Sequence, residues 1–319
     1  MYNEPLFLEP VLKERIWGGT KLNEAFGYFL PSDQTGECWG ISAHPNGACT
    51  IKNGPLHGQT LRTAWKEHRE LFGREDGEEF PLLVKLLDAA DDLSVQVHPD
   101  DSKARVLEEG EAFGKTECWY VVQADPGASL ILGHNADSKE ELEKRMKEGD
   151  WEALLRTVPV QAGDFFYVPS GTIHAIGGGA LILETQQSSD TTYRVYDYDR
   201  TDADGNKREL HLGKSLEAAK VPHKDPKSSR DVVHQGDNGV VEQLVHSPYF
   251  QVYRMHCRSR LSPGLDAPYV LATVLRGEGT IETEEKTIPV EKGQHFIIPA
   301  TMQHWEVKGD IELIVSTRQ

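Results

Sequence analysis

The fold is decided by the stretch GDFFYVPSGTIH, residues 163–174. Gly163 opens it, a mostly apolar run follows, and Pro169 precedes a short polar turn that ends at His174. The same order recurs without gaps in residues 293–304, GQHFIIPATMQH. Each copy is typical of a tight turn, an apolar strand, a bend at proline and a histidine at the start of the next strand. Two copies of one unit predict two similar β-domains in tandem.

Short apolar runs bounded by Gly, Pro and Asp dominate the rest of the chain, as in residues 82–87, 117–123 and 180–185. Their length and flanks predict strands. Apolar residues at helical spacing are fewer, and they predict helices at 60–72, 101–110, 138–149 and 213–221. We therefore expect a mainly β fold with small helical insertions.

The boundary between the two domains is predicted from a polar stretch, VPHKDPKSSRDVVHQGDNG, residues 221–239. It is rich in turn-forming residues and is typical of a linker. Placing the boundary near Asp231 gives a first domain of residues 1–230 and a second of residues 231–319.

Composition limits the partners. The net charge of −17 disfavours nucleic acid and anionic membranes as partners, although a small anionic substrate remains possible where local charge is positive. No run reaches the roughly 18 apolar residues of a membrane span, and the first residues lack the pattern of a signal peptide. The four cysteines form no CxxC pair and are expected to be reduced thiols. We predict a cytoplasmic protein, and no protein partner is evident.

Two strand patterns place side chains that bind metals on one face. In LSVQVHP, residues 93–99, Gln96 and His98 share the face opposite the apolar residues. In KTECWYVV, residues 115–122, Lys115, Glu117 and Trp119 share a face. Taken alone, the first pattern equally describes a strand with one polar face in water, and the second a salt bridge beside a packed tryptophan.

A third candidate, His174, ends the repeated stretch, whereas a lone histidine after a turn is more often structural. Two imidazoles and one carboxylate are ligands that zinc prefers. We therefore expect His98, Glu117 and His174 to hold one divalent ion, with zinc the favoured metal.

Gly163, Pro169, Gly171 and His174 fill an element, G-x5-P-x-G-x2-H, that resembles the second signature of the cupin barrels. The motifs SVQVHPDD, GKTECWY, PSGTIHAIGGG and SSDTTYRVYDYDR, with RIWGG and GECWGISAHP, together resemble the type I mannose-6-phosphate isomerases in their short bacterial form. The resemblance implies two tandem cupin-type (jelly-roll) β-barrels, with a helical insertion in the first. Only the first would bind metal and catalyse, because the second has His304 but no partner strand of the Gln-x-His type.

The resemblance also implies the ligands and the reaction. The ligands would be Gln96, His98, Glu117 and His174, holding one zinc ion per chain. The reaction would interconvert mannose 6-phosphate and fructose 6-phosphate through a metal-stabilised cis-enediol or enediolate. Arg194 would stabilise the enediolate. Without the resemblance, a surface ion pair of Arg194 with a nearby aspartate is the simpler interpretation.

The proton carrier stays open between Glu184 and Lys115, and Lys115 is also a candidate to contact a substrate oxygen. Trp17 and Glu37 are candidates to line the sugar pocket, although a core role is as reasonable for the tryptophan. The phosphate site has no recognisable loop.

Two other functions fit the same residues. Two histidines and a carboxylate are also the pattern of an iron-dependent cupin dioxygenase. A non-catalytic cupin that binds a sugar phosphate is the alternative from outside the enzymes.

Overall fold

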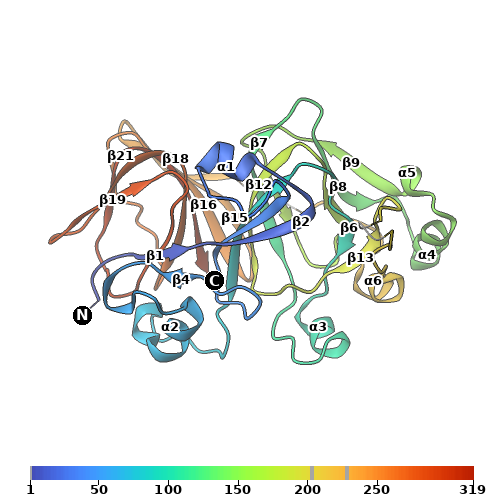
Figure 1. Ribbon diagram of the computed structural model, residues 1–319, viewed down its shortest axis with the longest axis horizontal. Helices are drawn as coiled ribbons and strands as arrows, with labels where there is room; N and C mark the ends of the chain where they lie inside the picture. The colour runs from blue at the N-terminus through green and yellow to red at the C-terminus, as the bar shows by residue number, and fades with distance from the viewer. Residues whose placement is uncertain (1, 202–204, 227–229) are drawn as a thin grey trace.

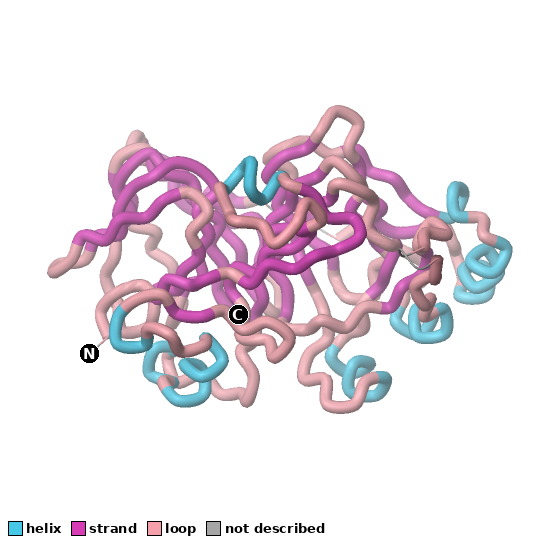
Figure 2. The backbone as a smooth tube through the Cα atoms, viewed as in Figure 1, coloured by secondary structure: helices cyan, strands magenta, loops and turns pink. Residues whose placement is uncertain are grey.

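The computed structural model describes residues 2–201, 205–226 and 230–319 and consists mainly of antiparallel β-strands, as predicted (Figure 1). The helices are short and lie outside the sheets (Figure 2). Among the described residues, no helix combines the length and the apolar character needed to cross a membrane.

Two antiparallel sheets build the part of the molecule that holds the predicted site. The six-stranded sheet has the order β10 (Phe165–Val168), β7 (Glu117–Ala124), β12 (Ala180–Gln187), β5 (Leu82–Ala89), β3 (Thr35–Ile41) and β2 (Val11–Gly19). The five-stranded sheet has the order β13 (Tyr193–Tyr196), β6 (Val95–Val97), β11 (His174–Ile176), β8 (Ser129–His134) and β9 (Leu155–Pro159). One apolar cluster joins Trp119 and Ile182 of the first sheet to Leu130 and Ile176 of the second. The two sheets therefore face each other as the layers of a sandwich.

The predicted alternation is confirmed within β6 but is wrong at Leu93, which precedes the strand and packs between the two sheets. Val95 and Val97 pack on the outer face of the five-stranded sheet, in a cluster with Leu142 of helix α4 (Lys139–Glu148) and Ala218 of helix α6 (Leu212–Ala218). Because successive side chains of a strand point to opposite faces, Gln96 between them faces the six-stranded sheet.

The predicted helices all form, most of them shorter than expected. The range predicted at 60–72 forms helix α2 (Leu61–Glu67) and the 3-10 helix η2 (Arg69–Phe72). The range predicted at 101–110 forms helix α3 (Asp101–Leu107). Helix α4 begins after Ser138, whose hydroxyl accepts a hydrogen bond from the Glu141 amide, as its capping pattern predicts. The remaining helices are α1 (Lys21–Phe26), η1 (Gly54–Leu56) and α5 (Trp151–Leu154).

The third sheet contains ten strands; those from the C-terminal part of the chain are seen in orange and red in Figure 1, and β1 (Leu6–Glu9) and β4 (Thr50–Ile51) in blue. Its main path runs β14 (Asp231–Gly236), β15 (Gly239–His246), β16 (Phe250–Cys257), β21 (Glu306–Arg318), β18 (Val270–Glu282), β20 (His295–Ile298), β1 and β4. Strand β17 (Arg260–Leu261) pairs with β21, and strand β19 (Thr287–Glu291) pairs with β18. Strands β1 and β4 belong to the first predicted domain but pair in this sheet, so the chain start ties the two predicted domains together.

The stretch predicted as a linker, residues 221–239, is only partly irregular where it is described, and residues 227–229 lie outside the described residues. Residues 231–236 form β14, which pairs with β15 in a hairpin. Its six residues are all exposed, so the polar composition that suggested a linker reflects exposure to water.

The two copies of the repeat share their backbone design. Gly163 and Gly293 both adopt positive φ, 90° and 87°, at the turn before an apolar strand, which favours glycine there. The copies differ at their last residue, because His174 is buried at the start of β11 while His304 is exposed.

Candidate metal centre and substrate cavity

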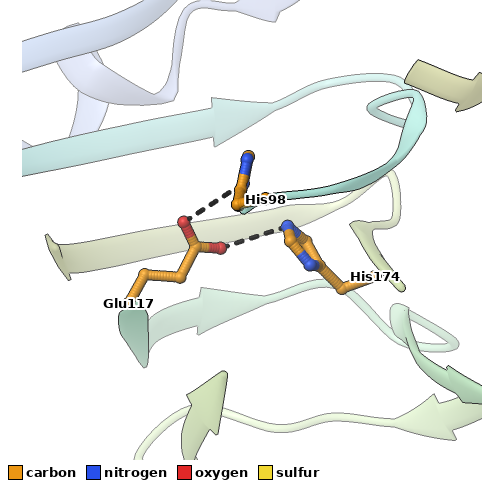
Figure 3. Close-up of side chains that lie close together, drawn as sticks. All are labelled: His98, Glu117 and His174. Carbon is orange, nitrogen blue, oxygen red and sulfur yellow. Dashed lines mark ion pairs between the residues drawn. The ribbon is translucent and has the colours of Figure 1, made fainter. Parts of the chain in front are cut away.

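Three strands of the sandwich bring His98, Glu117 and His174 together (Figure 3). His98 follows β6, Glu117 begins β7 and His174 begins β11. The Nε2 atom of His98 lies 3.5 Å from Oε2 of Glu117, and Nε2 of His174 lies 3.2 Å from Oε1. One ligand atom from each residue lies within 4.8 Å of the other two, and all three side chains are buried.

The other ring nitrogen of each histidine is held by a backbone carbonyl. His98 Nδ1 lies 2.9 Å from the Thr191 carbonyl oxygen, and His174 Nδ1 lies 2.8 Å from that of Thr172. Because a carbonyl oxygen only accepts, each Nδ1 carries the proton and each Nε2 of a neutral ring carries a lone pair. Both lone pairs are thereby directed towards Glu117.

The electrostatics of this cluster call for a cation. Burial lowers the pKa of His174 to about 3 and lowers that of His98 well below its usual range, so both rings are neutral. Burial, together with the charge of Glu184, raises the pKa of Glu117 to about 8, although Lys115 opposes this shift. Within the described residues, His98 Nε2 and both carboxylate oxygens of Glu117 are buried without a hydrogen-bond partner. A divalent cation fits this donor set, because it would satisfy the atoms that are left unpaired.

Gln96 lies beside the three residues. It is the strand partner of His174, and its Nε2 atom lies 3.4 Å from Nε2 of His174. Turning its amide by 180° would present the carbonyl oxygen at the same place.

A cavity of about 360 Å³ opens next to the cluster, between the two sheets. It is lined by Gln96 and by five further residues proposed from the sequence, namely Trp17, Glu37, Lys115, Glu184 and Arg194. The other three proposed residues, His98, Glu117 and His174, form the adjoining cluster. The fold therefore brings every residue proposed from the sequence to one place.

Lys115 and Glu184 approach the cavity from the six-stranded sheet. Lys115 Nζ lies 3.4 Å from Oε2 of Glu117. Burial lowers the pKa of Lys115, but Glu117 and Glu184 outweigh it, and the net shift is upward. Glu184 accepts a hydrogen bond from Trp119 Nε1 at 3.1 Å through Oε2, while its Oε1 lies 3.5 Å from Lys85 Nζ.

Among the described residues, Arg194 forms no surface ion pair. The aspartates considered for it are paired elsewhere, Asp197 with Arg200 and Arg208, and Asp199 with Lys207. Arg194 is the strand partner of Gln96 and donates through Nη1 to the Glu209 carbonyl at 2.8 Å. Its buried Nε has no hydrogen-bond partner among the described residues.

Trp17 and Glu37, the two candidates from the start of the chain, line the cavity and also contact other residues of the interior. Trp17 packs in the apolar cluster between the sheets and also lines the cavity. Glu37 lies 2.9 Å from Arg15 and accepts a hydrogen bond from Trp39 Nε1 at 2.7 Å. Burial raises the pKa of Glu37, but Lys85 and Arg15 outweigh it and lower the pKa overall.

Sequence reasoning missed Lys85, Asp190 and Arg208, which also line the cavity. Lys85 carried a usable signal, since it is the single charge inside the apolar run LLVKLL, residues 82–87. A buried lysine in such a strand requires a partner, and here the partner is Glu184. Asp190 and Arg208 lie in loops, where no periodicity marks their direction.

Comparisons with known proteins agree with one another. A family model described as phosphomannose isomerase type I, catalytic domain, matches residues 6–118, and one described as mannose-6-phosphate isomerase, cupin domain, matches residues 241–318. The chain is 50% identical to the mannose-6-phosphate isomerase ManA of Bacillus subtilis, covering 99% of each chain. It is also 50% identical to the mannose-6-phosphate isomerase of Streptococcus mutans, covering 98% of each. The crystal structure of the mannose 6-phosphate isomerase from Bacillus subtilis superposes with a TM-score of 0.95 at 50% identity, covering 98% of this chain and 99% of that one.

Proposed function

The chain belongs to the type I mannose-6-phosphate isomerases and interconverts mannose 6-phosphate and fructose 6-phosphate; from this premise we propose that it does so with one zinc ion, held by His98, Glu117 and His174 with Gln96 as a fourth ligand. The observation that carries the proposal is the convergence of three buried side chains, in which His98 Nε2 and both carboxylate oxygens of Glu117 have no hydrogen-bond partner among the described residues. Neutral imidazoles, a carboxylate and an amide oxygen suit a borderline divalent ion and leave a position for substrate.

The substrate would occupy the cavity next to this cluster, whose size suits a sugar phosphate. A bound zinc ion would supply Lewis-acid polarisation of the sugar carbonyl, which makes the neighbouring C–H more acidic. The reaction then moves one proton between C2 and C1 through a cis-enediolate. Arg194, which keeps its charge at every working pH, would hold the negative oxygen that develops.

Of the two candidates for proton transfer, we favour Glu184. Its Oε1 atom is buried with no hydrogen-bond partner among the described residues, and its Oε2 atom is fixed by Trp119. The Oε1 atom, which lies 3.5 Å from Lys85 Nζ, is the oxygen that would take the proton, while Oε2 sets the direction of the carboxylate. Lys115 is paired with Glu117 and has a raised pKa, so it holds its proton and suits a hydrogen bond to a substrate oxygen.

We further propose that Trp17 and Glu37 border the sugar, and that residues 1–230 form the catalytic domain. Residues 231–319 would form a domain without metal, because His304 is exposed and far along the chain from any Gln-x-His strand. The enzyme would work in the cytoplasm, since the four cysteines are free and buried, as expected of reduced thiols.

Reconstitution tests the choice of zinc. The metal-free enzyme would be loaded in turn with Zn²⁺, Mn²⁺, Co²⁺ or Fe²⁺ and assayed for mannose 6-phosphate isomerisation and for oxygen consumption. We expect Zn²⁺ to bind most tightly and to restore isomerisation, with no oxygen consumed by any form. Substrate turnover that is restored only by Fe²⁺ and that consumes oxygen would favour the dioxygenase chemistry instead. Tight binding of mannose 6-phosphate without turnover in any loaded form would favour the non-catalytic alternative.

A further inference from the structure

The segment between helix α3 and strand β7, residues 108–116, lies close to the metal cluster although none of its residues is a predicted ligand. Its Glu111 accepts a hydrogen bond through Oε2 from the hydroxyl of Thr191, at 2.9 Å. The carbonyl oxygen of the same Thr191 accepts the hydrogen bond from His98 Nδ1, also at 2.9 Å. Glu111 and His98 are therefore joined through the two polar ends of one residue.

Thr191 lies between β12 and β13 and belongs to neither strand, so no sheet ladder fixes its peptide. The direction of its carbonyl then depends on local hydrogen bonds, one from its own amide to Ser189 Oγ at 3.2 Å and one from its hydroxyl to Glu111. That direction matters, because the carbonyl keeps the His98 proton on Nδ1 and leaves the Nε2 lone pair for a ligand.

The segment that presents Glu111 is itself anchored. Asp101 accepts hydrogen bonds through Oδ1 from the Gly114 amide at 2.8 Å and from Gln187 Nε2 at 2.9 Å, and Gln187 accepts one from the Thr116 amide at 2.9 Å. Gly114 packs so tightly that a Cβ there would lie 2.4 Å from the backbone of Asp100. Glu111 is thus held in place relative to the end of β12.

We propose that Glu111 is a positioning residue for the metal centre, acting through Thr191 to hold His98 in the tautomer and orientation that bind the ion. This inference rests on the proposed function, since it requires His98 to be a ligand. Glu111 would not touch the substrate or the ion. Substituting Glu111 should therefore weaken the affinity for zinc more than it lowers the kcat of the zinc-loaded enzyme.

The test compares Glu111→Ala, Glu111→Gln and Thr191→Val with Glu109→Ala, which removes an exposed carboxylate from the same segment. Thr191→Val removes the hydroxyl but keeps the carbonyl that His98 uses. The zinc Kd of each full-length variant is measured by competition with a chromophoric chelator. The melting temperature of each metal-free form and the kcat at saturating zinc are measured beside it.

Partners of metal-bound histidines typically contribute 10-fold or more to metal affinity. We therefore expect Glu111→Ala and Thr191→Val each to weaken zinc binding by about 10-fold, and the double variant to weaken it no further than either alone. Glu111→Gln, which keeps an acceptor oxygen, should stay close to wild type, as should Glu109→Ala. The metal-free melting temperatures should stay unchanged.

An unchanged zinc Kd in both Glu111→Ala and Thr191→Val would overturn the proposal, as would an equal loss in Glu109→Ala. Both results leave the proposed function intact, provided that the wild-type enzyme binds one zinc ion. A wild-type enzyme that binds no zinc at this site would instead refute the proposed function, and this inference with it.

Discussion

Glu117 and His174 belong to opposite sheets of the sandwich, yet Oε1 of the carboxylate and Nε2 of the imidazole lie 3.2 Å apart. Neither atom is exposed to water, and the ring proton is held on the far side by the Thr172 carbonyl. The carboxyl group thus faces a lone pair in the interior, where its ionised form is costly unless a cation lies between them, and burial accordingly raises its pKa to about 8. The metal hypothesis explains why the fold maintains this arrangement.

The fourth ligand position can be tested at Gln96. An imidazole is a stronger zinc ligand than an amide, so Gln96→His should tighten zinc binding, while Gln96→Ala should weaken it. The loss in Gln96→Ala should be smaller than in His98→Ala, because Gln96 supplies no charge and no imidazole. Zinc Kd values from chelator competition would decide. Equal affinity in wild type and in both Gln96 variants would remove Gln96 from the ligand set.

The role of Arg194 predicts a specific kinetic signature. If its guanidinium holds the enediolate, Arg194→Ala should lower kcat by about 10²–10³-fold, the usual cost of losing one donor to a developing oxyanion. Bound metal should stay at the wild-type level. Arg156→Ala, which breaks a surface pair with Asp225, is the matched control. Near wild-type turnover in Arg194→Ala would show that Arg194 does not act on the transition state.

The proton carrier can be identified by isotope exchange. In heavy water, the wild-type enzyme should incorporate deuterium from solvent at the carbon that receives the proton. Glu184→Gln should lose both turnover and exchange by about 10²–10⁴-fold, because a neutral amide cannot take the proton. Lys115→Met should lose turnover while retaining measurable exchange. The opposite pattern would assign proton transfer to Lys115 and leave Glu184 as the partner of Lys85.

The buried His295 predicts acid sensitivity that is independent of the metal. It lies 2.9 Å from Thr273 Oγ1 and 2.9 Å from Tyr28 Oη, and burial lowers its pKa to about 3. The unfolded chain, with the usual pKa near 6.5, binds more protons than the folded state between these two values. The free energy of unfolding should therefore fall as the pH drops below about 6.5.

One such group contributes at most about 1.4 kcal/mol per pH unit. His295→Gln should show a slope smaller by about that amount when urea unfolding of the metal-free proteins is followed from pH 7.5 to 4.5. His98 and His174 act equally in both proteins and cancel in the difference. Identical slopes would mean that His295 titrates alike in the folded and unfolded chains.

The sequence allowed the mainly β class and the positions of the helices to be predicted, because alternation and helical spacing are local properties. The shared strand face of Gln96 and His98 and the repeat that marks His174 pointed to the metal cluster, whereas candidates for the cavity such as Arg194 and Glu184 came with the family resemblance. What the sequence could not provide was the pairing of strands far apart in the chain. The joining of β1 to β20 follows from long-range packing, which leaves no periodic pattern in the chain. The hairpin of β14 with β15 is local, but the polar, exposed residues of β14 resemble those of a linker.

Partnerships were equally hard to predict. Arg194 lies close in sequence to several acidic residues, yet Asp197 pairs with Arg200 and Arg208 and leaves Arg194 for the cavity. Lys85 was missed because its partner, Glu184, comes from a strand far along the chain.

The most direct test of the account is the metal content of the purified enzyme, measured beside mannose 6-phosphate isomerisation before and after chelation. The account predicts one ion per chain in wild type and in His304→Ala, and almost none in His174→Ala or Glu117→Gln. It also predicts that activity disappears with the ion and returns when zinc is added. Full activity in the chelated, metal-free enzyme, or metal retained in His174→Ala and lost in His304→Ala, would contradict it.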